Sequence, residues 1–328
     1  MKQRIVYIDN LKALAIFTVV IGHVFWFTWN HYTDSIWCHL IVAYNMPLFF
    51  FLSGMFAKDN MNLEQLGRKV KQLLLPTIIV GGIYAYIHEG LWEILFGRMH
   101  FGYWFLPALF QMFVLFYFRS FILSFLRKKL NIGRKMTISF DVVYMFGCWG
   151  LARKMTDYVP EDIYNMLCLG HIAENALFFW SGFLVWQNKE MIVKYLGRYK
   201  DMIYAICFLL FAGIFYLCYY SGYEIPGIVV KIMALLSIVL LMIFFQKYSF
   251  GNGKIQKAIG YVGSHSLEIY LLQYFFLPTN YQLGNSVYWG VNCLCISLIE
   301  SMITVVLCVV VIKIIDINKY LNLLFFGK

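Results

Sequence analysis

Charged residues are scarce in this chain. Lysine, arginine, aspartate and glutamate make up 13% of its 328 residues, whereas hydrophobic residues make up 61%. So little charge excludes a water-soluble globular domain, in which about a quarter of the residues are charged. The sequence has instead a series of apolar runs of about 20 residues, the length that crosses a bilayer as a helix. The composition therefore predicts a polytopic helical membrane protein.

The sequence also lacks the short motifs of several enzyme classes. It has no nucleotide-binding loop, no GxSxG elbow and no cluster of metal ligands. Its eight cysteines include no CxxC pair, and Cys293 with Cys295 is too isolated for a metal site. We therefore expect no metal, and we interpret the cysteines as small core residues. The net charge of +10 does not indicate a nucleic-acid partner, because of the way it is distributed along the chain.

We place ten membrane spans, which give an all-α bundle of about ten transmembrane helices. We expect one integral-membrane domain over residues 1–328, without a fused soluble domain. The first apolar run is long and lacks a small-residue cleavage site, so we interpret it as a retained span and not a cleavable signal. The spans are 11–30, 36–57, 73–97, 104–126, 137–152, 163–186, 202–222, 227–246, 258–278 and 288–315.

Lysine and arginine gather in alternate connecting segments. With the N-terminus inside, 23 of the 27 lie in segments that face the cytoplasm. A bias this strong in short loops places both termini in the cytoplasm. We therefore expect a multi-pass protein of the cell (cytoplasmic or inner) membrane, with the lipid bilayer as a partner and the oligomeric state unknown.

The first span carries three ionisable side chains on one face. Lys12 and His23 are eleven residues apart, so on a helix they share a face to within about 20° and lie roughly 16 Å apart along the axis. Asp9 falls within about 40° of His23 on the same geometry. Ionisable residues inside a membrane are functional candidates by default. The alternative is that Asp9 and Lys12 form an interfacial helix end and that His23 is a satisfied core histidine.

A second group of cations, Arg68, Lys69 and Lys71, precedes the third span. Clustered cationic donors suit a polyanionic cofactor that carries phosphates. Positive-inside residues need no ligand, however, and topology alone explains many such clusters.

Several carboxylates lie within the spans, where each is costly unless it faces a partner or a wet cavity. His171 and Glu174 are three residues apart and therefore share a helix face. Carboxylates commonly bind sugar hydroxyls, so we expect Glu174, His171 and Glu268 on the acceptor side of a site. The carboxylates in question are Asp141, Glu174, Glu268 and Glu300.

The three ionisable residues Asp9, Lys12 and His23 form a polar stripe on the first span, with cationic groups at its cytoplasmic end and an imidazole deep inside it. This arrangement suits acyl transfer from a phosphorylated donor. A thioester of coenzyme A has a phosphate-rich head, an extended arm and a reactive end. We expect the head near Lys12, Arg68, Lys69 and Lys71, with Asp9 orienting Lys12. A neutral imidazole is a natural general base for a hydroxyl acceptor, and we assign that role to His23. The less favoured alternative is that His23 carries the acyl group transiently.

Five stretches of the sequence together resemble the motifs of a known family. They are IDNLKALAIFTVVIGH (8–23), MPLFFFLSGMF (46–56), GRKVKQLLLP (67–76), YWFLPALF (103–110) and SLEIYLLQ (266–273). The family is acyltransferase family 3, integral-membrane enzymes that O-acylate sugars and other envelope molecules. The resemblance spans essentially the whole chain and implies that His23 is catalytic and that the basic motif before the third span acts on acyl-CoA.

Two residues depart from the family pattern. Lys12 stands where arginine is most common and lacks the bidentate fork of that residue. Gln273 stands where many relatives have histidine, so we assign it no proton-transfer role.

The sequence therefore predicts an acyl-CoA-dependent membrane O-acyltransferase. It would move an acyl group, expected to be acetyl, from cytoplasmic acyl-CoA (acetyl-CoA) to a hydroxyl of a sugar or lipid-linked glycan. One alternative is a transporter or exporter of a polysaccharide or small polar substrate, although no matched pair of broken spans indicates inverted repeats. Another is a sensor that binds coenzyme A without turnover.

Overall fold

The computed structural model describes residues 5–130, 133–220, 226–248, 253–278, 283–286 and 290–328. It is 85% helical with almost no strand, which confirms the all-α prediction. Among the described residues, eight helical stretches are long and apolar enough to cross a membrane. These are Val6–Thr28, Ile36–Met55, Leu63–Ile87, Phe105–Leu130, Glu161–Gln187, Lys189–Tyr219, Gly227–Lys247 and Val291–Asp316.

The expected count of ten spans stays a prediction. Of the two other expected spans, 137–152 lies within helix α8, Arg134–Lys154. The span expected at 258–278 is divided into α14, Lys254–Ser264, and α15, Ser266–Leu272, with His265 between them. The orientation also stays a prediction, and it draws in part on Lys2 and Arg4, which lie outside the described residues.

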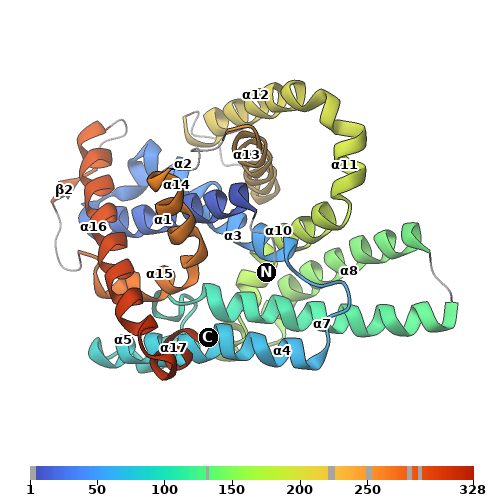
Figure 1. Cartoon of the computed structure of the whole chain (residues 1–328), viewed down its shortest axis with the longest axis horizontal. Helices are drawn as coiled ribbons and strands as arrows, with labels where there is room; N and C mark the ends of the chain where they lie inside the picture. The colour runs from blue at the N-terminus through green and yellow to red at the C-terminus, as the bar shows by residue number, and fades with distance from the viewer. Residues whose placement is uncertain (1–4, 131–132, 221–225, 249–252, 279–282, 287–289) are drawn as a thin grey trace. The chain divides into compact units, whose positions relative to one another are not determined.

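The chain divides into two compact units, each built from separated stretches of sequence (Figure 1). The first unit comprises Met1–Phe49 and Lys189–Ile312, and the second comprises Phe50–Asn188 and Lys313–Lys328. The first contains α1 (Val6–Thr28), β1 (Trp29–Asn30), α2 (Ile36–Val42), α11 (Lys189–Leu196), α12 (Lys200–Tyr219), α13 (Gly227–Lys247), α14, α15, β2 (Gly284–Asn285) and most of α16 (Val291–Asp316). The second contains most of α3 (Asn45–Met55), α4 (Leu63–Lys69), α5 (Gly82–Ile87), α6 (Leu91–Phe96), α7 (Phe105–Leu130), α8, α9 (Glu161–Met166), α10 (Leu169–Gln187) and α17 (Lys319–Phe326).

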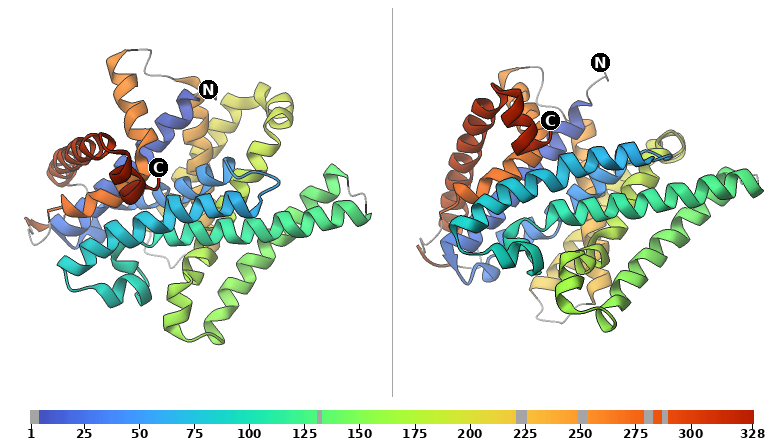
Figure 2. Two further views of the ribbon diagram at one scale, coloured as in Figure 1. Left: turned by 60° about the horizontal axis from the view of Figure 1, so that its bottom comes forward. Right: turned by 90° about the horizontal axis from the view of Figure 1, so that it is seen from below.

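Helix α1 is the centre of the first unit, and α14 lies against it (Figure 1 and Figure 2). The approach is close because Gly263 has no side chain: a Cβ there would lie 2.0 Å from the Asp9 carbonyl oxygen. Two amide groups join the same helices, since Gln256 Nε2 donates to Asn10 Oδ1 at 2.7 Å. These contacts hold the N-terminal half of α1 in a fixed position within the unit.

Helix α16 holds the other end of α1. Thr28 Oγ1 donates to Glu300 Oε2 at 2.9 Å, and Trp29 Nε1 donates to Ser297 Oγ at 3.0 Å. Trp29 and Asn30 also pair in parallel with Gly284 and Asn285 as the strands β1 and β2. Glu300 therefore has the polar partner that a carboxylate inside an apolar helix needs.

In the second unit, two glycines allow α3 and α10 to cross with their backbones in contact. A Cβ on Gly54 would lie 1.8 Å from the Phe179 carbonyl oxygen, and one on Gly182 would lie 2.0 Å from the Phe51 carbonyl oxygen. The contact is reciprocal, because each glycine faces a carbonyl of the other helix. Small residues at such crossings are typical of membrane helices.

Alanine at either glycine should therefore destabilise the protein. Overpacking a well-packed contact costs about 1–3 kcal/mol, and we expect Gly54→Ala and Gly182→Ala each to lower the free energy of unfolding by at least the lower figure. Thermal unfolding in detergent measures the effect. Gly147→Ala in α8 is the matched control, since a Cβ there has nothing within 4 Å. Equal melting temperatures for all three variants would contradict the close crossing.

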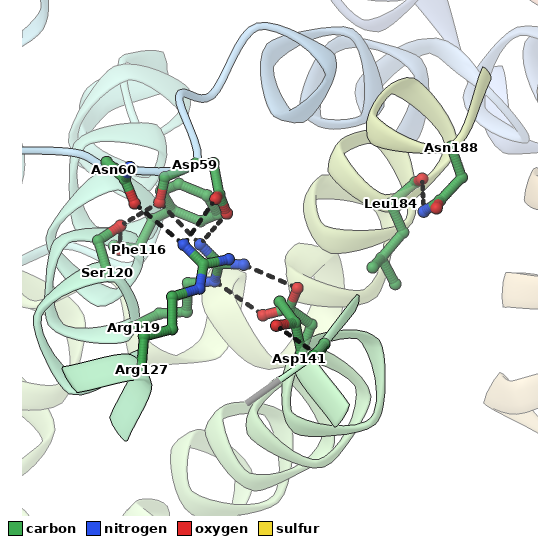
Figure 3. A network of polar contacts seen from close by, with 11 residues as sticks. Asp59, Asn60, Phe116, Arg119, Ser120, Arg127, Asp141, Leu184 and Asn188 are labelled. Carbon is green, nitrogen blue, oxygen red and sulfur yellow. Dashed lines mark hydrogen bonds and ion pairs between the residues drawn. The ribbon is translucent and has the colours of Figure 1, made fainter. Parts of the chain in front are cut away.

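A network of charges joins α7 and α8 of the second unit to Asp59, which lies between α3 and α4 (Figure 3). Arg119 is fully buried, and its Nε and Nη2 each donate to an oxygen of Asp141 at 2.7 Å. Its Nη1 donates to Asp59 Oδ1 at 2.6 Å, and Arg127 Nη1 donates to Asp59 Oδ2 at 3.1 Å. Asp141 thus has the partner predicted for a carboxylate in a span. Arg119, which counted toward the cytoplasmic bias, is a buried structural residue.

The network makes stability sensitive to acid. Burial alone raises the pKa of the Asp59 carboxyl, but Arg119 and Arg127 outweigh burial and hold that pKa below its ordinary value. The ionised Asp59 carboxylate therefore contributes fully to stability above the ordinary aspartate pKa of about 3.9. This contribution is lost as the pH falls toward the lower pKa that the carboxyl has in the folded protein. We expect the melting temperature of the unmodified protein to fall more steeply below about pH 4 than that of Asp59→Asn. Parallel acid titration curves would contradict this assignment.

Candidate active site

His23 lies in α1 of the first unit and is partly exposed, as is Gly22 before it, whereas Val24 after it is buried. Its Nδ1 lies 3.1 Å from Gln273 Oε1, and its Nε2 lies 3.1 Å from Tyr274 Oη. The rings of His23 and Tyr274 are 5.1 Å apart between centroids. Both ring nitrogens therefore face polar groups of the same unit, and part of the side chain stays accessible.

Sequence reasoning did not select Tyr274. Gln273 and Tyr274 begin the 3₁₀ turn η7, Gln273–Phe275, which follows α15 directly. Consecutive residues of a helix point about 100° apart, so helical periodicity does not predict that both would reach one imidazole. The sequence signal that could have pointed to Tyr274 is that a polar and an aromatic residue stand together at the end of an apolar segment.

Asp9 and Lys12 lie on the same helix as His23 and are likewise partly exposed. The side chains next to them, Ile8 and Leu11, are buried. The predicted polar stripe stays a prediction, because apolar residues of α1 such as Leu14 are also partly exposed. The expectation that Asp9 orients Lys12 stays a prediction.

The second cationic group belongs to the second unit and lies on an irregular helix. Arg68 and Lys69 end α4, and Lys71 lies in the π-helical turn η2, Val70–Leu74. In this segment the Leu75 N–H bonds to the Val70 carbonyl. Pro76 cannot donate a backbone hydrogen bond, and π-helical turns occur frequently at functional sites.

The three cationic side chains of this group differ in their exposure and in their contacts. Arg68 and Lys71 are exposed and Lys69 is partly exposed. Arg68 Nη1 forms an ion pair with Glu64 Oε1 at 3.4 Å, a surface contact of little energetic value. Lys69 Nζ lies 4.5 Å from the centre of the Phe113 ring. Arg68 and Lys71 thus present charge at the surface of the second unit, where an anion can reach it.

The predicted pair of His171 and Glu174 lies on α10 of the second unit. His171 Nδ1 is 3.7 Å from Glu174 Oε2, and His171 Nε2 is 2.8 Å from the Arg98 carbonyl oxygen. Arg98 Nη2 also pairs with Glu174 Oε1 at 3.2 Å. The Trp104 ring stacks on His171 with centroids 4.0 Å apart. Sequence analysis did not select Arg98 or Trp104 for this cluster, because they lie far from it in the sequence.

Glu268 lies in α15 of the first unit and is buried, with 3% of its surface exposed. Its carboxylate is therefore less accessible than that of Glu174, whose side chain is 52% exposed. The expectation that Glu268 binds the acceptor stays a prediction.

Comparison with known proteins gives one family. A family model described as an acyltransferase domain, that of acyltransferase family 3, matches residues 5–315, nearly the whole chain. The matched range contains all the candidate site residues named above. No curated protein and no solved structure matches the chain.

Proposed function

The chain belongs to this acyltransferase family, and from that premise we propose that it transfers an acyl group from acyl-CoA to a hydroxyl of a sugar or lipid-linked glycan at the cell membrane. One observation carries the proposal. The Nε2 atom of the partly exposed His23 has a hydroxyl, Tyr274 Oη, at 3.1 Å. An acceptor hydroxyl that takes the place of Tyr274 Oη would lie within the distance at which a general base abstracts a proton. Family membership favours an enzyme over the exporter and sensor alternatives.

The proposed reaction is a direct transfer. The acceptor oxygen attacks the thioester carbonyl carbon, a carbon–oxygen bond forms, and the carbon–sulfur bond breaks. His23 takes the acceptor proton and returns it to the departing thiolate of coenzyme A. Acetyl is the expected acyl group, so that acetyl-CoA is the expected donor.

We assign the donor's phosphates to the cationic side chains Lys12, Arg68, Lys69 and Lys71. Clustered ammonium and guanidinium groups bind phosphate through charge-assisted hydrogen bonds. The exposure of Arg68 and Lys71 supports this assignment. Asp9 would hold Lys12 in place as its neighbour on one helix face.

We assign the acceptor to Glu174 and His171, with Glu268 as a further candidate. The exposed Glu174 carboxylate offers acceptor atoms to sugar hydroxyls. Arg98 adds donors beside it, and Trp104 adds an aromatic surface next to His171. A polar cluster with an aromatic ring supports a sugar as the acceptor.

Binding of acetyl-CoA should stabilise the purified protein. A ligand at a hundred times its dissociation constant adds about 2.7 kcal/mol to the free energy of unfolding, and we expect a clear rise in melting temperature. Acetyl-pantetheine, which lacks the nucleotide phosphates, should give a smaller rise. No shift with any coenzyme A species would count against the proposal.

Variants that remove one positive charge test where the phosphates of acetyl-CoA bind. Lys71→Gln should weaken the stabilisation by acetyl-CoA and leave that by acetyl-pantetheine unchanged. Lys194→Gln is the matched control, because Lys194 is an exposed lysine on α11 with no proposed role. The acceptor is identified separately by mass spectrometry of envelope glycans from cells with and without the protein.

A further inference from the structure

The side-chain amide of Gln273 is fully buried and held at both of its ends. Its Nε2 donates to the Tyr270 carbonyl oxygen at 3.1 Å, and its Oε1 lies 3.1 Å from His23 Nδ1. A backbone carbonyl can only accept a hydrogen bond. The amide nitrogen must therefore face Tyr270, and the opposite orientation would place two oxygens against each other.

This orientation determines where the hydrogen of the imidazole lies. The Gln273 Oε1 atom accepts only, so His23 Nδ1 must carry the hydrogen. In a neutral imidazole the other nitrogen then has the free lone pair. That nitrogen is Nε2, and the Tyr274 hydroxyl, 3.1 Å away, donates to it.

We infer that Gln273 is a positioning residue that fixes His23 as the Nδ1–H tautomer and so makes Nε2 the basic nitrogen. The catalytic consequence rests on the proposed function, whereas the tautomer itself does not. Because Nε2 has one lone pair, the Tyr274 hydroxyl must give way there to the acceptor hydroxyl. Its O–H bond breaks, the proton passes to Nε2, and the resulting imidazolium keeps its Nδ1–H bond to Gln273. The same proton then leaves Nε2 for the thiolate sulfur of coenzyme A.

Nitrogen-15 NMR of histidine-labelled protein tests the inference without any turnover. At about pH 8, where an imidazole is neutral, the His23 signals, assigned by their loss in His23→Ala, should show a protonated Nδ1 and an unprotonated Nε2. Gln273→Met keeps the approximate size of the side chain but removes the acceptor, and the Nε2–H tautomer should become populated. Gln273→Glu keeps an acceptor oxygen and should retain the Nδ1–H form.

Two controls separate this effect from general damage to α1. Tyr274→Phe removes the hydroxyl at Nε2 and should leave the tautomer unchanged. Gln256→Met breaks a partly buried amide contact to α1, with Asn10, and should also leave the tautomer unchanged. An Nε2–H form in the unmodified protein, or an unchanged tautomer in a folded Gln273→Met, would overturn the inference.

Kinetics give the second readout. With the wrong tautomer the base is unavailable, so Gln273→Met should lower kcat by about 10²-fold, the low end of what a general base supplies. The KM for acyl-CoA should change little, and Gln273→Glu should restore part of the rate. A folded Gln273→Met with an altered tautomer and full kcat would overturn the positioning role. The Nδ1–H form in a protein without acyl-CoA-dependent transfer would support the tautomer and count against the proposed function.

Discussion

His23→Gln should lower the rate of acyl transfer by at least about 10²-fold, and by as much as 10⁴-fold, because a general base contributes that range. Glutamine is similar in length and can still hydrogen-bond, so the variant should fold and purify. It should also keep the thermal stabilisation by acetyl-CoA, since His23 contacts the acceptor proton and not the phosphates in the proposed reaction. Single-turnover assays with acetyl-CoA measure the chemical step directly.

His39→Gln is the matched control for that experiment. His39 is a second histidine of the first unit within a membrane span, and its ring stacks on Tyr219 with centroids 4.0 Å apart. Because it has no proposed role in transfer, its replacement should leave the rate close to that of the unmodified protein. Full activity in folded His23→Gln would remove His23 from the mechanism.

Asp141→Ala should be the most destabilising of the proposed substitutions. It leaves the fully buried Arg119 guanidinium without its bidentate partner, and breaking a buried ion pair on one side costs about 3–5 kcal/mol. We expect a large fall in melting temperature and in the yield of folded protein. Asp201→Ala is the matched control: the ion pair of Asp201 with Lys247 is exposed, and such pairs contribute about 0–1 kcal/mol.

A double variant separates charge burial from packing. Arg119→Met with Asp141→Leu removes both charges and replaces them with apolar side chains. Such replacements of buried ion pairs are often neutral or stabilising, so the double variant should be more stable than Asp141→Ala. Asp59 would retain Arg127 as its partner. A double variant less stable than the single one would show that the network stabilises the unit beyond compensation of buried charge.

The parts of the site that follow helix periodicity were predictable. The polar stripe on α1 depends on residue spacing alone and stays a prediction. Asp9, Lys12 and His23 are partly exposed, but so are apolar residues of the same helix such as Leu14 and Phe17. The neighbouring positions of His171 and Glu174 follow from the same rule, and their side chains are 3.7 Å apart. Residues three apart on a helix lie on one face, which is why the neighbouring positions of His171 and Glu174 could be predicted.

Contacts between distant segments were not predictable in this way. Arg119 resembles any arginine at the cytoplasmic end of a span, and its burial depends on Asp59 and Asp141 from other segments. The expected span 258–278 is divided into α14 and α15 at His265, and no proline or charged residue at the break predicts this division from the sequence. The turn η7, which directs Gln273 and Tyr274 to His23, follows from that irregular geometry. These features arise from tertiary packing, which composition and spacing do not encode.

The glycine crossing of α3 and α10 also limits how the second unit can move. Sliding or rotating one helix would replace a glycine with a residue that carries a side chain, and that side chain would strike the opposite carbonyl. The two helices therefore behave as one rigid piece about a fixed pivot. Any rearrangement that admits a substrate must come from other helices, while this pair turns as a whole or stays still.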